Sequence, residues 1–131
     1  MSFPAPVPGA IVWCHFPTRE LRVRGIKPRP ALVLTVGDLP DGTMMVGIAY
    51  GTSQKVNNLH RGEFAIAPAD GDAFNVSGLW LPTKFNLSER VELPYAEKWF
   101  LVPPNARHGQ NPMLGFLHAS LYKRAAAALA V

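Results

Sequence analysis

The chain reads RPALVLTVGDLPDGTMMVGIAY from Arg29 to Tyr50, and this segment has the pattern of a β-hairpin. Residues 30–36 form a nearly continuous apolar run, as expected of a strand that is buried on both faces or wrapped in a barrel. Asp38-Leu-Pro-Asp-Gly42 is a turn signal, and residues 43–50 supply a second strand. We therefore predict that 30–36 and 43–50 pair as an antiparallel hairpin.

Shorter patterns on both sides of the hairpin predict further strands. These segments are rich in β-branched and aromatic residues and are bounded by turn residues. They are residues 9–16, 63–66, 79–87 (interrupted by Pro82) and 90–93, with a turn at 68–72. We expect about six short strands.

The C-terminal segment predicts a helix over residues 112–129. Asn111 suits the N-cap and Pro112 the first helical position. Four apolar residues recur at helical spacing and would form one face, which packs in the domain or at a subunit interface: Leu114, Leu117, Leu121 and Ala125.

Composition limits the class of protein. Thirteen prolines and eleven glycines among 131 residues break helices and central strands often, which favours a small barrel or sandwich over a helical bundle. The length suits one domain, and we place it at residues 9–131 after an extended lead-in at 1–8. Cys14 is alone, which excludes a disulfide scaffold, and no Cys/His cluster has zinc-ligand spacing, so we expect neither metal nor cofactor.

Charge and targeting signals indicate a cytoplasmic protein with an anionic partner. The formal net charge is +4, and four cations gather in the polar segment 17–28 against one acid, Glu20. A positive field of this kind favours polyanions, nucleic acid first. The sequence has no apolar run long enough to span a membrane, and its start lacks the features of a signal peptide.

Three parts of the chain resemble the MazF/PemK family of toxins. The first is Gly9-Ala-Ile-Val-Trp13, the second is Arg29-Pro-Ala-Leu-Val-Leu34 after a basic loop, and the third is the pair Thr52-Ser53. The resemblance implies a mainly β fold, a small SH3-like β-barrel with a C-terminal α-helix, commonly a homodimer. It also implies metal-independent cleavage of single-stranded RNA, a cognate antitoxin as partner, and catalytic roles for Arg29 and Thr52.

One departure from the family pattern keeps a second interpretation open. Many members carry an Asp-Gln-x-Arg segment on a later strand, whereas the similar segment Ser77–Asn86 has neither Asp nor Arg, and Lys84 is its only charge. The alternative is a non-catalytic SH3-like module that binds nucleic acid or protein. A third possibility is a structural or phage-encoded interaction protein in which the basic loop is incidental.

The chemistry of metal-free RNA cleavage suggests roles for particular side chains. Arg29 offers a planar fork to phosphate oxygens, Thr52 can bond a phosphate oxygen, and His15 could accept the proton of the ribose 2′-hydroxyl. The residues predicted to bind RNA are Arg22, Arg24, Lys27, Ser53, Gln54, Lys55 and Lys84. Each has a plain structural alternative: a surface ion pair for Arg29, a strand-closing turn for Thr52, a half-buried strand residue for His15 and solvated loop charges for the rest.

Aromatic side chains could also stack on bases. The candidates are Trp13, Trp80, Phe85 and Tyr95. Most of them should belong to the core, and we expect at most one to take this role.

Overall fold

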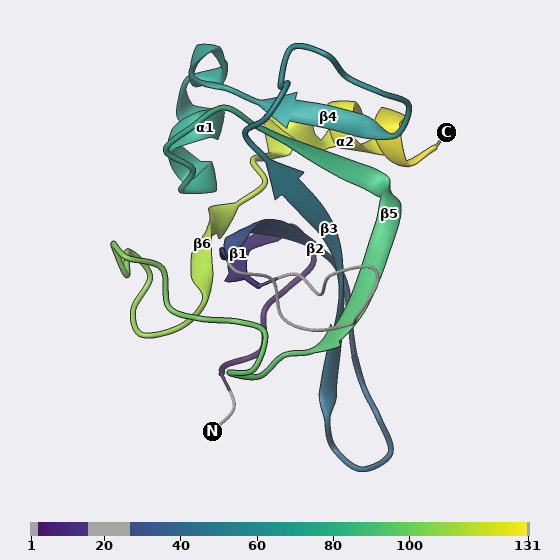
Figure 1. Cartoon of the computed structure of the whole chain (residues 1–131), viewed down its shortest axis with the longest axis vertical. Coiled ribbons are helices and arrows are strands. Elements are labelled where there is room, and N and C mark those ends of the chain that lie inside the picture. Colours follow the sequence, from purple (N-terminus) through teal and green to yellow (C-terminus); the bar gives the residue numbers. More distant parts are fainter. Residues whose placement is uncertain (1–2, 16–26, 131) are drawn as a thin grey trace.

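The predicted hairpin forms the centre of a six-stranded antiparallel sheet with the order β4-β5-β3-β2-β1-β6. The computed structural model describes residues 3–15 and 27–130. The strands curl into a half-barrel, and the hairpin turn projects away from the helices (Figure 1). The elements are β1 (Ala10–Cys14), β2 (Arg29–Asp38), β3 (Met44–Thr52), β4 (Glu63–Ile66), a 3-10 turn (Pro68–Asp70), α1 (Asp72–Ser77), β5 (Thr83–Pro94), β6 (Met113–Phe116), a second 3-10 turn (Ala119–Leu121) and α2 (Tyr122–Leu129). This confirms the mainly β, barrel-like fold class.

The hairpin register is the part of the fold that matters most for function. β2 and β3 pair with Ala31 opposite Tyr50 and Leu32 opposite Ala49. Near the open end of the hairpin the strands approach closely, because a Cβ on Gly51 would lie 2.7 Å from the Pro30 carbonyl oxygen and 2.8 Å from the Phe85 ring. Glycine at position 51 therefore permits the contact between the two strand ends.

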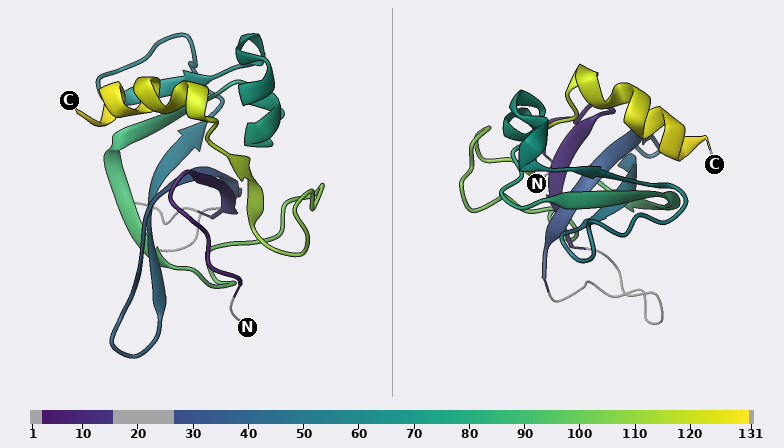
Figure 2. Two further views of the ribbon diagram at one scale, coloured as in Figure 1. Left: turned by 180° about the vertical axis from the view of Figure 1, so that it is seen from behind. Right: turned by 90° about the horizontal axis from the view of Figure 1, so that it is seen from above.

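The sheet carries a hydrophobic core on each face, because alternate side chains of each strand point to opposite sides. One core places Ile11, Leu32 and Phe85 against residues from both helices, such as Ala73 on α1 and Ala125 on α2. The other lies between the opposite sheet face and the segment 95–100: Ala10, Val12, Cys14, Ala31, Val33, Val46, Ile48, Leu93, Tyr95, Trp99 and Phe100. This second face explains the apolar character of both hairpin strands. Figure 2 shows the sheet and helices from two further directions.

The prediction of separate strands at 79–87 and 90–93 was wrong, because Thr83–Pro94 is a single strand and residues 79–82 precede it. β5 is one long strand with an irregularity, since Ala49 pairs with Arg90 and the next residue, Tyr50, pairs with Asn86. The Ser88 backbone N–H donates to the Asn86 side chain, and the Ser88 hydroxyl donates to the Arg61 carbonyl. These bonds stabilise the bend that lets β5 pair with β3 along its length and with β4 at its start.

The prediction that the C-terminal helix begins at residue 112 was also wrong. Residues Met113–Phe116 form β6, which pairs with the edge of β1, and α2 begins only at Tyr122. The Asn111 side chain accepts a bond from the Met113 N–H, so it closes a turn before a strand instead of capping a helix. Leu114 still reaches the helix-side core, but from the sheet. An unpaired strand edge therefore outweighed the helical spacing of the leucines.

The predicted turn at 68–72 overlaps a 3-10 turn, and the six-residue helix α1 that follows was not predicted. Of the predicted polar segment 17–28, residues 17–26 lie outside the described residues. In the lead-in, Phe3 packs edge-on against Tyr95, with ring centroids 5.9 Å apart. No helix in the described ranges is long and apolar enough to cross a membrane.

Candidate functional site

Arg29 and Thr52, which are 23 positions apart in sequence, meet at the open end of the hairpin. Arg29 begins β2 and Thr52 ends β3. Continuing the register of Ala31 and Tyr50 by two residues sets Arg29 opposite Thr52. Directly opposed residues on adjacent strands have neighbouring side chains, so the two strand ends bring a cation and a hydroxyl together.

Both residues line a pocket of about 130 Å³. Its walls come from the two strand ends, from Trp13 on β1, and from the segment between α1 and β5. The lining residues are Trp13, Pro28, Arg29, Pro30, Gly51, Thr52, Ser53, Leu79, Trp80, Leu81 and Thr83. The pocket is therefore polar at the hairpin end and apolar at the other.

Arg29 is a half-buried residue, and its guanidinium has no carboxylate within salt-bridge distance among residues 3–15 and 27–130. Its central carbon lies 5.6 Å from the centre of the Tyr50 ring. A cation over an aromatic face is attracted to it without losing its charge. In the described part of the chain, the surface ion pair that was the structural alternative for Arg29 is therefore absent.

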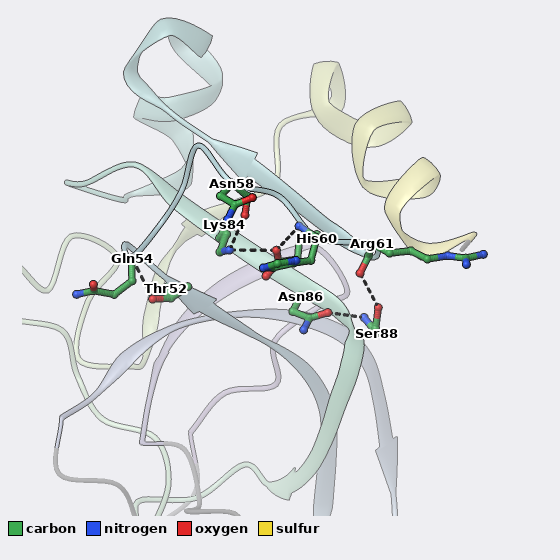
Figure 3. A network of polar contacts seen from close by, with 9 residues as sticks. Thr52, Gln54, Asn58, His60, Arg61, Lys84, Asn86 and Ser88 are labelled. Atoms are coloured by element: carbon green, nitrogen blue, oxygen red, sulfur yellow. Dashed lines mark hydrogen bonds and ion pairs between the residues drawn. The ribbon is translucent and has the colours of Figure 1, made fainter.

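Thr52 begins a tight polar turn that leaves the sheet. Its hydroxyl oxygen accepts a hydrogen bond of 3.1 Å from the Gln54 backbone N–H (Figure 3). Ser53, Gln54 and Lys55 that follow are exposed, and Lys55 has a left-handed backbone (φ 50°). Ser53 also lines a second, larger and more open hollow together with Lys55. The turn thus continues the polar end of the pocket across the surface.

Lys84 has a different environment from the one expected of a phosphate contact. Its ammonium donates to Glu63 Oε1 and to the Asn58 carbonyl, both at 3.0 Å, and the Lys84 and Glu63 side chains are only 7% and 9% exposed. Burial acts to raise the pKa of Glu63, but hydrogen bonds from the His60 N–H and from Lys84 outweigh it and hold that pKa below its usual range. Figure 3 shows Lys84 directed into this network. The Lys84 ammonium therefore anchors the loop at residues 55–63 to β5.

The remaining predicted site residues lie either outside the pocket lining or outside the described residues. His15 directly follows Cys14, which pairs with Arg29, but His15 is not among the residues that line the pocket. Lys27 is exposed, two residues before Arg29. Arg22 and Arg24 lie outside the described residues.

Of the apolar wall of the pocket, sequence reasoning had named only Trp80, as a candidate for base stacking. Leu79, Trp80 and Leu81 form it, and Thr83 completes it at the start of β5. A sequence signal was present: Gly78 follows a short amphipathic segment and precedes three apolar residues and Pro82, the pattern of a turn that is anchored to a core. In the described ranges, no group of three or more His, Cys, Asp or Glu could hold a metal ion.

A solved structure described as an endoribonuclease in complex with its cognate antitoxin, from a mycobacterial species, has a similar fold. The TM-score is 0.56 and the identity 17%, and the match covers 96% of this chain and 92% of that one. The likeness shows a shared fold along nearly the whole length. No protein-family model and no curated protein matches the sequence.

Proposed function

We propose that this protein is an endoribonuclease of the toxin–antitoxin type that cleaves single-stranded RNA without a metal ion. The observation that carries the proposal is the juxtaposition of Arg29 and Thr52 at one pocket, with the guanidinium free of carboxylates in the described part of the chain. The fold shared with an endoribonuclease supports it. So does the net charge of +4, since the substrate is a polyanion.

In the proposed reaction the ribose 2′-oxygen attacks the adjacent phosphorus. The 2′-hydroxyl proton passes to an acceptor, for which we propose His15, and a new P–O bond forms as the bond to the 5′-oxygen breaks. The leaving oxygen takes up a proton, which gives a 2′,3′-cyclic phosphate and a 5′-hydroxyl. Arg29 stabilises the charge that develops on the non-bridging oxygens, and the Thr52 hydroxyl donates to one of them.

The proposed partners follow from the same function. The similar solved structure contains a cognate antitoxin, and we propose that an antitoxin neutralises this protein in the cytoplasm. We also propose a homodimer, because closed two-fold dimers are the commonest oligomers.

Incubation of purified protein with single-stranded RNA in excess chelator tests the activity. We expect RNA to be cleaved at an unchanged rate with and without chelator, and DNA of the same sequence to stay intact because it lacks the attacking hydroxyl. Loss of cleavage on chelation would contradict the proposal.

A non-catalytic module is the second candidate, and one observation favours it. In the described part of the pocket lining, Arg29 is the sole cation, since Lys84 is paired with Glu63 and the segment 77–86 supplies no Asp or Arg. RNA that is bound and left intact by wild-type protein would select this candidate.

Lys55→Ala should weaken RNA binding about equally for all sequences, because an exposed lysine contacts phosphate and not base edges. A plot of log affinity against log salt should become shallower by about 0.7, the value for one phosphate contact on a single strand. Fluorescence anisotropy across a salt series measures both effects. Lys123→Ala on α2 is the matched control, and an unchanged slope in Lys55→Ala would rule out this contact.

A further inference from the structure

The segment between α1 and β5 is a short arch that is fixed at both ends. At its start, the buried Ser77 hydroxyl donates to the Phe74 carbonyl and accepts from the Leu79 N–H. Gly78 has φ +73°, and a Cβ there would lie 1.9 Å from the Leu114 carbonyl oxygen, so the arch rests directly on β6. At its end, the Thr83 hydroxyl donates to the Leu81 carbonyl at 2.9 Å. The residues between these anchors are held in place.

This arch presents two large apolar side chains to solvent. Trp80 is 50% exposed and Leu81 is 51% exposed, and both line the pocket of Arg29 and Thr52. The other aromatic candidates for stacking differ, since Phe85 and Tyr95 are buried in the two cores. Adjacent exposed apolar residues on a fixed segment beside a pocket are typical of a binding surface.

The indole of Trp80 is itself supported from one side. Its ring centre lies 5.2 Å from that of Trp13, with 56° between the planes, and Trp13 packs against the helix-side core. A flat ring inserted between them would need about 7 Å, twice the contact distance of ~3.5 Å. A ligand ring can therefore stack on the exposed surface of Trp80 and cannot enter between the two indoles.

We propose that Trp80 is the stacking platform for one base of a bound RNA strand, next to the phosphate held by Arg29. The inference rests on the proposed function, and it specifies how the site takes a single strand. A nucleotide contains a charged phosphate and a flat aromatic base. The pocket lining contains a cation and a hydroxyl that suit the phosphate, and an exposed indole that suits the base. Stacking on an aromatic side chain tolerates every base, because each base has a π-face. It also requires the base to be unpaired, which restricts the substrate to single-stranded RNA.

Binding of two labelled strands of equal length tests the proposal. One is a 2′-O-methyl oligoadenylate, which cannot be cleaved by attack of its own hydroxyl, and the other is the same backbone without bases. Wild-type protein should prefer the oligoadenylate. Trp80→Ala should weaken oligoadenylate binding by roughly tenfold and leave the abasic strand unaffected, while Trp80→Phe should retain most of the preference. Tyr122→Ala is the matched control, because Tyr122 is 57% exposed on α2 and outside the pocket lining.

Three results would overturn the stacking role: equal wild-type affinity for both strands, an equal loss for both strands in Trp80→Ala, or no binding of either strand. Cleavage of single-stranded RNA is measured on the same wild-type sample. A preference for the oligoadenylate without cleavage would support the stacking role and contradict the nuclease proposal. Cleavage without that preference would support the nuclease proposal and contradict the stacking role.

Discussion

Arg29→Ala should slow RNA cleavage by roughly 10²–10³-fold, the usual loss when one preorganised donor to a developing oxyanion is removed. The expectation depends on geometry, because Arg29 starts β2, lines one pocket together with Thr52, and has no carboxylate within salt-bridge distance in the described ranges. Arg29→Lys should recover little, since an ammonium does not reproduce the planar two-point contact with phosphate.

Steady-state kinetics distinguish this role from simple attraction of RNA. If Arg29 acts in the transition state, kcat and kcat/KM should fall together and KM should change little. Arg61→Ala is the matched control, because Arg61 is an exposed arginine outside this pocket. Equal losses in Arg29→Ala and Arg61→Ala, or a change in KM alone, would show that Arg29 contributes only to binding.

Glu63→Ala should destabilise the fold by about 3 kcal/mol, at the low end of the range for breaking a buried ion pair. The substitution leaves the Lys84 ammonium buried with the Asn58 carbonyl as its remaining acceptor. Denaturant unfolding followed by circular dichroism measures the loss. The double variant Glu63→Gln, Lys84→Met should be more stable than Glu63→Ala, because it leaves no unpaired charge. A loss below 1 kcal/mol in Glu63→Ala would show that water reaches Lys84.

The same ion pair gives the protein a defined sensitivity to acid. The folded-state pKa of Glu63 lies below its ordinary value of 4.5 because the hydrogen bonds from His60 and Lys84 outweigh the effect of burial. Its contribution to stability is therefore complete above the unfolded pKa and is lost as the pH falls through the folded value. Stability of wild type should thus decline more steeply than that of Glu63→Ala between about pH 5 and pH 3.

The hairpin could be predicted from sequence because its signals are local, whereas Arg29 and Thr52 were indicated by the family resemblance. The apolar run 30–36 and the Asp41-Gly42 turn define which strands pair. The register at the strand ends could not be read from the turn, because the pairing shifts by one residue between Val33 and Thr35. The pairing of residues 113–116 with β1 could not be predicted, because it depends on β1 having an unpaired edge in the folded sheet.

The partner of Lys84 and the exposure of Trp80 also depended on tertiary structure. Glu63 is 21 residues from Lys84, and their contact forms only when β4 pairs with β5. Trp80 and Phe85 are five residues apart and equally apolar in sequence, yet one is exposed on the arch and the other is buried on β5. Gly78 and Pro82 mark the segment around Trp80 as a turn, but the local sequence does not say that the indole faces solvent.

We propose that RNA is cleaved by its own 2′-hydroxyl at the pocket of Arg29 and Thr52 without a metal ion. Mass spectrometry of the fragments that wild-type protein produces in excess chelator tests it most directly. We expect fragments that end in a 2′,3′-cyclic phosphate, each matched by a fragment that begins with a 5′-hydroxyl. Intact RNA, or fragments with a 3′-hydroxyl and a 5′-phosphate, would contradict it.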